Sequence, residues 1–312
     1  MTSTTTRSPY ASPVDEDRYG TYRITQGPDD PRPLYRFTGR LTRDGSSGFP
    51  AVAGRYHLYA GWFCPWAQRV VLELEVNGLT GPDGPVTVSY VDGARDGRGW
   101  AFRETNGPDP VNGFTLLRDA YEATEPGFDG HVSVPTLWDT DTDRIVSNDY
   151  RTLGLDVATE FPGLRHPGVD TYPVEHRAEI EELDRWVGPA VNQGVGRAGG
   201  DGPAAERART ELHAAFRRLD ARLVDGGFLV GHGLTEADIR LWVTLARYDV
   251  QGNAKGRLGP ALSTYPHLAR YAAYLAELPA FRASTRWSAF SAPGATPSFL
   301  PELPADLTGS TR

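Results

Sequence analysis

The hydrophobic positions early in the chain change from a strand-like pattern to a helical one and back, which predicts a β-α-β unit. Aromatic and aliphatic residues at 55–60 predict a short strand, and residues 86–91 predict a second one. Between them, a helix is predicted from Pro65 to a stop at 77–78, with apolar side chains at Val70, Val71, Leu74 and Leu79. Proline suits the first position of a helix, because its missing N–H would have no partner there. Cys64 therefore stands at the N-terminus of the predicted helix.

The segments that follow continue the alternation of strands and helices. Residues 92–114 form a loop rich in Gly, Asp and Asn, and residues 115–123 are expected to form a short helix. A strand at 132–138, interrupted by a proline, is followed by an Asp/Thr turn and an antiparallel strand at 144–147. With a helix from about 149 to 159, the order becomes β-α-β-α-β-β-α, which is the thioredoxin-like layout.

The second half of the chain shows helical periodicity in every strong segment. Two apolar faces are expected to pack in a bundle, one at Ile180, Leu183, Trp186 and Val187 and the other at Leu212, Phe216, Leu219 and Leu223. Thr235 and Asp238 form a capping-box pattern, which predicts a helix through Tyr248. We therefore divide the chain into an extended lead-in at 1–54, a thioredoxin-like α/β domain at 55–160, an all-α helical domain at 174–290 and an irregular tail at 291–312.

Composition and charge restrict the classes of function. A length of 312 residues fits two domains of about 100–200 residues each. The net charge of −8 offers no basic footprint for nucleic acid, and no apolar run reaches the roughly 20 residues that a membrane-spanning helix needs. The Ser/Thr-rich start at 1–10 lacks the apolar region of a secretory signal. We therefore expect a cytoplasmic protein that binds neither nucleic acid nor a membrane.

Cys64 is the only cysteine, so the chain can form no intrachain disulfide and no Cys-rich metal site. A free cysteine is often a buried small hydrophobic residue. At a helix N-terminus, however, unpaired N–H groups and the helix dipole stabilise a thiolate and favour nucleophilic chemistry at neutral pH. We therefore predict Cys64 as the catalytic nucleophile of a monothiol mechanism.

Two further motifs allow both a structural and a chemical interpretation. The pair Val134-Pro135 could be an edge-strand proline, but in a thioredoxin-like fold a proline here is commonly cis, faces the cysteine and exposes the preceding backbone to a thiol ligand. An acidic run at 139–143 begins like a calcium loop, yet Arg144 stands where Gly is required. We expect a cis proline and a hairpin turn. The 7 histidines show no metal-binding spacing, so no metal site is predicted.

Several motifs together resemble the Xi class of glutathione transferases, also called glutathionyl-hydroquinone reductases. The similarity runs from about Leu34 to Leu278, which is most of the chain. Its most specific parts are 54–59, Cys64-Pro65-Trp66-Ala67, 99–102, 134–139 and 234–241. The resemblance implies the glutathione transferase architecture, with a thioredoxin-like domain followed by a helical one, and a homodimer formed through the helical domain.

The resemblance also implies a reaction and a site. In that family a cysteine thiolate attacks the sulfur that links glutathione to a hydroquinone, releases the hydroquinone and leaves a mixed disulfide, which a second thiol resolves. Cys64 matches this nucleophile. The implied thiol-binding site consists of Trp100, His131, Val132, Ser133, Val134, Pro135, Asp149 and Tyr150. No bound cofactor is expected, and the implied partners are a low-molecular-weight thiol and an aromatic, quinone-like substrate.

The sequence departs from the family pattern where glutathione would be held. The family commonly has Arg where this chain has His131, and Glu-Ser where it has Asp149 and Tyr150. A catalytic Tyr of the family aligns with Gly196, and Gln68 stands where His is usual. We therefore expect the same nucleophile with a changed grip on the thiol.

The sequence thus predicts a cysteine-dependent thiol transferase or reductase that removes a thiol adduct from a quinone-like substrate through a mixed disulfide at Cys64. Three alternatives stay open: a glutaredoxin-like thiol-disulfide transferase, a conjugating glutathione transferase and a non-catalytic binding protein. Basic charge comes almost entirely from Arg, with Lys255 as the only Lys, which points to a GC-rich genome. The co-substrate is therefore expected to be glutathione or mycothiol, a sugar-linked cysteine used by some GC-rich bacteria.

Overall fold

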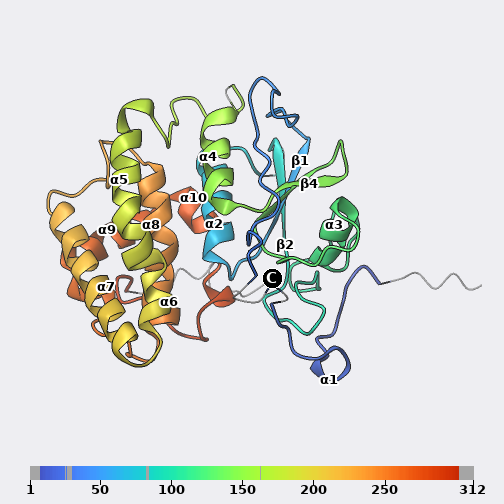
Figure 1. Ribbon diagram of the computed structural model, residues 1–312. Coiled ribbons are helices and arrows are strands. Elements are labelled where there is room, and N and C mark those ends of the chain that lie inside the picture. The colour runs from blue at the N-terminus through green and yellow to red at the C-terminus, as the bar shows by residue number, and fades with distance from the viewer. Residues whose placement is uncertain (1–7, 25, 27–29, 82–83, 162, 302–312) are drawn as a thin grey trace, which may run out of the picture. The chain divides into compact units, whose positions relative to one another are not determined.

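The computed structural model describes residues 8–24, 26, 30–81, 84–161 and 163–301, which fall into two compact units. Unit 1 comprises Met1–Leu74 and Gly78–Arg165, and unit 2 comprises Glu75–Asn77 and His166–Arg312. In the described part of the chain, every strand belongs to unit 1, whereas unit 2 contains helices and turns (Figure 1).

Unit 1 is built on a four-stranded sheet with the strand order β2-β1-β3-β4. β1 pairs in parallel with β2 and antiparallel with β3, and β3 pairs antiparallel with β4. All five residues of β1 are buried, because this strand is central and both faces of the sheet are covered. The strands are β1 (Tyr56–Ala60), β2 (Val86–Tyr90), β3 (Thr136–Asp139) and β4 (Arg144–Ser147).

Helices cover both faces of this sheet, with α2 and α4 on one side and α3 on the other (Figure 1). The observed order of strands and helices is the predicted β-α-β-α-β-β-α, so the thioredoxin-like layout is confirmed. A short helix, α1, precedes them in the lead-in. The helices of unit 1 are α1 (Glu16–Tyr19), α2 (Pro65–Val76), α3 (Leu117–Thr124) and α4 (Tyr150–Glu160).

Most boundaries agree with the sequence-based expectation to within one residue, and two larger differences have physical reasons. The strand expected at 132–138 begins only at Thr136, because Pro135 has no N–H to donate to a strand ladder. The helix expected from residue 115 begins at Leu117, because the Asp119 side chain accepts a hydrogen bond from the Leu116 N–H at 3.2 Å and so caps the helix there. The acidic run at 139–143 forms the β3–β4 hairpin turn, as predicted.

The described part of the lead-in belongs to unit 1 and packs on its edge strand β4 and on α4. Thr38 forms an antiparallel bridge with Ser147 of β4, so the lead-in continues the sheet beyond its edge strand. Arg40 Nε donates to the Asp156 carboxylate on α4 at 2.9 Å, and the Leu41 N–H donates to the same carboxylate at 2.9 Å. Backbone hydrogen bonds and an ion pair therefore both hold the lead-in in place.

Helices are the only regular secondary structure among the described residues of unit 2, in agreement with the predicted all-α domain. The expected capping box is present at the start of α8, where the Asp238 side chain accepts from the Thr235 N–H at 2.8 Å. Asp238 is fully buried and also accepts from the Leu229 N–H and the Tyr271 hydroxyl. The α-helices are α5 (Arg177–Val187), α6 (Gly194–Ala198), α7 (Pro203–Arg222), α8 (Glu236–Arg247), α9 (Pro266–Glu277) and α10 (Pro279–Ala283).

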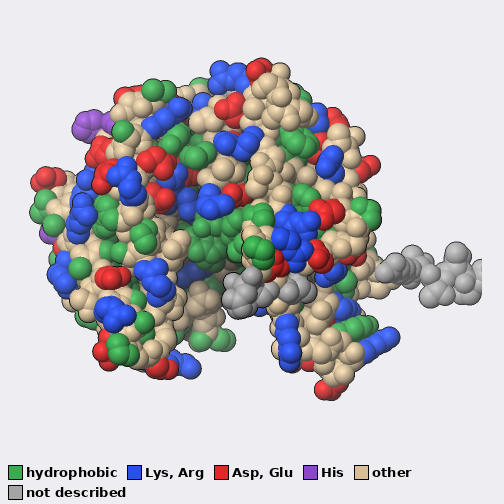
Figure 2. All heavy atoms as spheres, in the orientation of Figure 1, with side chains coloured by type: hydrophobic (Ala, Val, Ile, Leu, Met, Phe, Trp, Pro, Cys, Tyr) green, Lys and Arg blue, Asp and Glu red, His purple; other side chains and the backbone are tan. Residues whose placement is uncertain are grey.

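Basic and acidic side chains are interspersed over the face of the molecule that Figure 2 shows. Within the described ranges, no helix is both long enough and apolar enough to cross a bilayer.

Candidate functional site

Cys64 lies at the end of the loop that follows β1 and directly precedes α2. Its N–H donates to the Gly61 carbonyl oxygen at 2.9 Å, and its own carbonyl oxygen accepts the first hydrogen bond of the helix, from the Gln68 N–H at 3.0 Å. The side chain is half-buried. This loop therefore fixes the sulfur at the positive end of the α2 dipole, where a thiolate is stabilised.

The sulfur faces the Val134-Pro135 peptide bond, which is cis, as expected. Cys64 Sγ lies 3.6 Å from the Val134 carbonyl oxygen, to which the thiol donates. No described residue accepts a hydrogen bond from the Val134 N–H. The Val134 backbone thus offers a donor beside an acceptor, the pair that an extended thiol-containing ligand would need for strand-like pairing next to Cys64.

Ser133, another residue of the predicted site, already forms hydrogen bonds within the protein through its backbone and its side chain. Its N–H donates to the Tyr121 hydroxyl at 3.1 Å, and the Tyr121 hydroxyl donates to its carbonyl oxygen at 3.0 Å. Asn148 Nδ2 donates to its side-chain oxygen at 3.3 Å. Val132 packs against the hydrophobic core. These two residues therefore hold the segment in place, while Val134 and Pro135 face the sulfur.

Trp100 stacks on Phe63, the residue before Cys64, with ring centroids 4.4 Å apart. The Arg95 guanidinium lies 3.9 Å from the centre of the Trp100 ring and 4.2 Å from that of Tyr22. No carboxylate of the described residues forms an ion pair with Arg95. Arg95 is thus a cation at the site that the sequence analysis missed, because nothing in a Gly-rich loop shows which way a side chain points.

His131 lies near this cation. Burial, and after it the Arg95 charge, lowers the pKa of His131, so the imidazole is neutral at neutral pH. Its Nδ1 is buried without a hydrogen-bond partner among the described residues. Position 131 therefore supplies a neutral group, while the positive charge in this region comes from Arg95.

Asp149 is the N-cap of α4, and its carboxylate is already paired. It accepts from the Arg151 N–H at 3.1 Å, from Arg151 Nε at 2.8 Å and from Arg151 Nη2 at 2.7 Å. Since a bidentate guanidinium uses both carboxylate oxygens, Asp149 is poorly placed to receive a ligand ammonium group. Asp149 was predicted from the sequence, but its pairing with Arg151 depends on side-chain direction, which the sequence does not show.

Tyr150 forms part of an aromatic wall. Its ring stacks on Trp66, the second residue of α2, with centroids 4.8 Å apart and an interplanar angle of 24°. The Arg69 guanidinium lies 5.3 Å from the centre of the Tyr150 ring. A small hydroxyl at this position would leave room for a ligand, whereas Tyr150 fills that room with a ring.

Two other predictions concern a residue of unit 2 and the absence of a metal site. Gly196 lies in α6, and no heavy atom lies within 4 Å of the position that its Cβ would take, so the helix leaves space where the family has a tyrosine. Within the described residues, no group of three or more His, Cys, Asp or Glu side chains is arranged to hold a metal ion.

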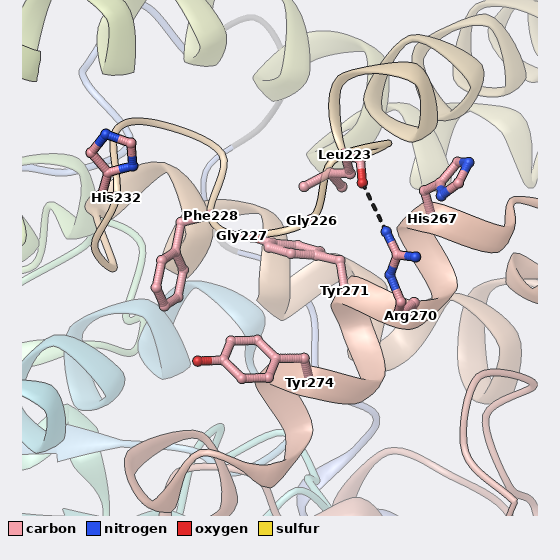
Figure 3. A pocket seen from close by; sticks show the side chains of 9 residues that line it. All are labelled: Leu223, Gly226, Gly227, Phe228, His232, His267, Arg270, Tyr271 and Tyr274. Atoms are coloured by element: carbon pink, nitrogen blue, oxygen red, sulfur yellow. Dashed lines mark hydrogen bonds between the residues drawn. The ribbon is translucent and has the colours of Figure 1, made fainter.

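Unit 2 contains a pocket of about 300 Å³ beside α9, shown in Figure 3. Two of its polar side chains have structural roles: Arg270 Nη2 donates to the Leu223 carbonyl oxygen at the end of α7 at 3.2 Å, and the Tyr271 hydroxyl donates to buried Asp238 at 2.7 Å. No predicted site residue lines this pocket. The candidate functional site is therefore the surroundings of Cys64 in unit 1.

The chain is similar to known proteins in sequence and in structure. The family model described as "Glutathione S-transferase, C-terminal domain" matches residues 202–273. Glutathionyl-hydroquinone reductase PcpF of Sphingobium chlorophenolicum is 36% identical over 236 residues, covering 74% of each chain. The crystal structure of the glutathione-S-transferase Xi from Phanerochaete chrysosporium superposes with a TM-score of 0.76 at 32% identity, covering 83% of this chain and 89% of that one. The glutathione-bound structure of YqjG from Escherichia coli also gives a TM-score of 0.76, at 31% identity, covering 81% and 85%.

The position of Cys64 at the start of α2 predicts fast alkylation by iodoacetamide near neutral pH. The pH profile of the rate should have a midpoint below about 8.5, because the helix N-terminus favours the thiolate more than the single Val134 carbonyl contact favours the thiol. Free cysteine, alkylated in parallel, provides the reference profile. A midpoint equal to or above that reference would contradict the prediction.

Proposed function

The chain belongs to the Xi class of glutathione transferases, the glutathionyl-hydroquinone reductases, and on this premise we propose that it removes a thiol adduct from a quinone-like substrate through a mixed disulfide at Cys64. It is an enzyme of the glutathione transferase family, a thiol-dependent transferase or reductase. The observation that carries the proposal is the placement of Cys64 Sγ at the N-terminus of α2, 3.6 Å from the Val134 carbonyl oxygen.

The proposed reaction has two steps. In the first, the Cys64 thiolate attacks the sulfur that joins the carrier thiol to the aromatic ring. A sulfur–sulfur bond forms, the carbon–sulfur bond breaks, and the ring carbon takes up a proton to give the free hydroquinone. In the second, a further thiol molecule attacks the carrier sulfur, which releases Cys64 and a disulfide of two carrier thiols. The substrate is thus reduced by two electrons, which the two thiols supply.

In this scheme the surrounding groups orient the sulfur that is attacked. The Val134 N–H and carbonyl oxygen would pair with the peptide-like part of the carrier thiol, next to its sulfur. The carbonyl oxygen accepts a hydrogen bond from the Cys64 thiol before reaction. Loss of the proton frees the sulfur to attack, and the N–H groups at the start of α2 stabilise its charge.

We propose that the carrier is a thiol other than glutathione, with mycothiol as the leading candidate. The positive charge of Arg95 could still hold a carboxylate, so the neutral His131 does not by itself exclude glutathione. The γ-glutamyl end of glutathione gives the stronger argument against glutathione, because its ammonium group would meet the Asp149 carboxylate, which is already paired with Arg151. A sugar carries no charge and needs no such partner.

Three other functions of this site would give different results in activity measurements. A glutaredoxin-like enzyme would use Cys64 but prefer disulfides to quinone conjugates. A conjugating transferase would activate the thiol of the co-substrate and would not need Cys64 as a nucleophile. A binding protein would show no turnover of either kind. Cys64 and its surroundings favour the reductase, because a poised nucleophile beside a free strand-like edge serves attack on a bound thioether.

We also propose a cytoplasmic location and a homodimer formed through the helical unit. That unit exposes large apolar side chains, among them Val174, Val224 and Tyr274, and exposed apolar surface favours association.

The dimer makes a prediction for solution measurements. Multi-angle light scattering across micromolar concentrations should give about twice the mass of 34.1 kDa calculated for one chain. A mass that stays at the value for a single chain throughout this range would contradict the dimer.

The reductase proposal predicts that Cys64→Ser abolishes release of hydroquinone from a thiol conjugate. The hydroxyl of serine is a far weaker nucleophile than a thiolate, so turnover should fall by at least about a thousandfold. Intact mass spectrometry of the unaltered protein should show a Cys64 mixed disulfide when the second thiol is withheld. Substantial turnover by Cys64→Ser would favour the conjugating transferase instead.

The thiol proposal predicts a preference between matched conjugates. Losing one charge-assisted contact typically costs about 1.5–3 kcal/mol, so kcat/KM should be at least tenfold higher for a mycothiol conjugate of a quinone than for its glutathionyl counterpart. Both conjugates should carry the same quinone, so that only the thiol differs. If the glutathionyl form is turned over with equal or better efficiency, mycothiol is not the preferred carrier.

A further inference from the structure

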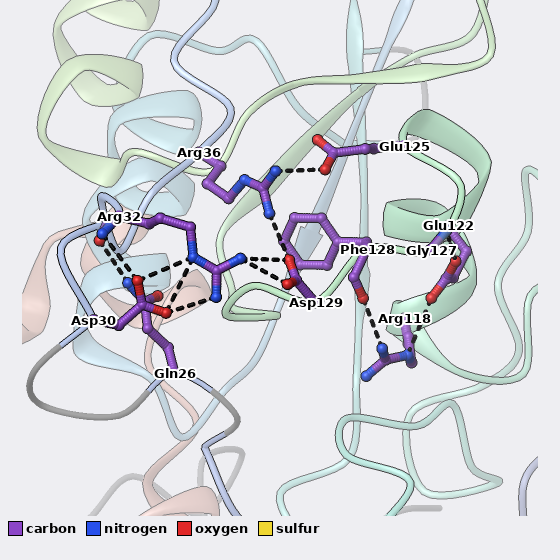
Figure 4. A network of polar contacts seen from close by, with 10 residues as sticks. All are labelled: Gln26, Asp30, Arg32, Arg36, Arg118, Glu122, Glu125, Gly127, Phe128 and Asp129. Carbon is purple, nitrogen blue, oxygen red and sulfur yellow. Dashed lines mark hydrogen bonds and ion pairs between the residues drawn. The ribbon is translucent and has the colours of Figure 1, made fainter.

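The lead-in is tied by ion pairs to the loop between α3 and β3 (Figure 4). Arg32 Nη1 donates to both carboxylate oxygens of Asp129 at 2.7 Å, and Arg36 Nη1 donates to the same carboxylate at 2.9 Å. Arg36 also pairs with Glu125 at 2.5 Å. These contacts fasten the lead-in to the loop that leads into the cis-proline segment.

A second connection joins the lead-in to the other side of the site. The Asn148 N–H donates to the Phe37 carbonyl oxygen at 2.9 Å, and the Phe37 N–H donates to Asn148 Oδ1 at 3.3 Å. Asn148 Nδ2 also donates to Ser133 Oγ, and Asn148 directly precedes Asp149 at the cap of α4. The lead-in is thus braced against both segments that would contact the thiol.

Tyr35 lies between these two connections, at the side of Tyr150. The two ring centroids are 5.9 Å apart with the rings nearly perpendicular, and the Arg151 guanidinium lies 5.4 Å from the centre of the Tyr35 ring. The Tyr35 hydroxyl has no hydrogen-bond partner among the described residues. Burial, and after it the charges of the Tyr150 and Cys64 groups, raises the pKa of this hydroxyl. It therefore stays protonated and available as a donor.

We propose that Tyr35 is a specificity-determining residue of the thiol site, which forms with Tyr150 the wall that receives the end of the carrier thiol remote from its sulfur. This inference rests on the proposed function of the Cys64 site. It assigns a role to the lead-in, which lies outside the thioredoxin-like layout and for which the sequence suggested none.

The chemistry of this wall selects the carrier. Three rings follow one another, since Trp66 stacks on Tyr150 and Tyr150 meets the Tyr35 ring at its edge. Aromatic faces pack well against the C–H groups of a sugar ring, and the free Tyr35 hydroxyl can donate to a sugar hydroxyl. An ammonium group finds no comparable partner here, because two guanidinium groups lie over these rings. The wall therefore favours an uncharged, ring-bearing thiol over a γ-glutamyl thiol.

The test measures binding separately from turnover. Titration calorimetry would give the Kd of two ligands, S-methyl mycothiol and S-methyl glutathione. Each ligand is titrated into three full-length proteins: the Cys64→Ser variant alone, and the same variant combined with Tyr35→Ala or with Tyr35→Phe. Tyr35→Ala should weaken binding of the mycothiol derivative about tenfold and change that of the glutathione derivative less than twofold. Tyr35→Phe should recover most of the loss, because the ring remains.

Tyr19→Ala is the matched control. Tyr19 is also a lead-in tyrosine with a guanidinium, that of Arg98, over its ring, and among the described residues no hydrogen bond, ion pair or ring contact joins it to the proposed site. It should leave both Kd values unchanged. With Cys64 present, the alkylation rate of Tyr35→Ala should equal that of the unaltered protein, which shows that the loop at the sulfur is intact.

The outcomes separate this inference from the proposed reaction. If Tyr35→Ala leaves the ratio of the two Kd values unchanged, or weakens both derivatives equally, Tyr35 does not determine specificity, whatever the turnover results show. If instead the ratio shifts as expected while Cys64→Ser retains turnover, the wall is established and the proposed reaction is wrong.

Discussion

The buried hydroxyl of Tyr121 is the constraint on which the geometry of the site depends. It hydrogen-bonds both backbone groups of Ser133 and accepts from Asn148 Nδ2 at 3.2 Å. One phenol on α3 thus fixes the residue that precedes Val134 and connects it to the residue that precedes the N-cap of α4. Because the contacts are buried, replacing the hydroxyl would leave several polar groups without partners, which is costly. The direction of the Val134 carbonyl toward Cys64, and hence the reacting geometry, follows from this junction.

The parts of the fold that the sequence predicted are those with a local physical signal. The helix after Cys64 follows from apolar spacing and a proline suited to its first turn, and the start of α8 follows from the pairing of Thr235 with Asp238. The lead-in was unpredictable, because its order comes from pairs such as Arg32 with Asp129, which lie 97 positions apart in sequence. The periodicity of hydrophobic residues along the chain carries no information about such a contact.

The same distinction applies to the candidate site. Cys64 and the cis bond at Pro135 could be anticipated, since each depends on backbone context that a short motif specifies. The occupation of Asp149 by Arg151 and the position of Arg95 over Trp100 could not, because both depend on side-chain direction. The family resemblance implies which residue types differ at the site, whereas the structure shows that the α4 cap carries a paired carboxylate beside an aromatic wall.

This division suggests how one fold can change its carrier thiol without changing its chemistry. In the proposed reaction the N–H groups at the start of α2 stabilise the Cys64 thiolate, so side-chain substitutions elsewhere leave the nucleophile intact. The grip on the remote end of the thiol is made by side chains from α2, α4 and the lead-in, and each can change alone. Recognition and reaction use different atoms. A change of carrier thiol therefore requires substitutions only among the side chains of the aromatic wall.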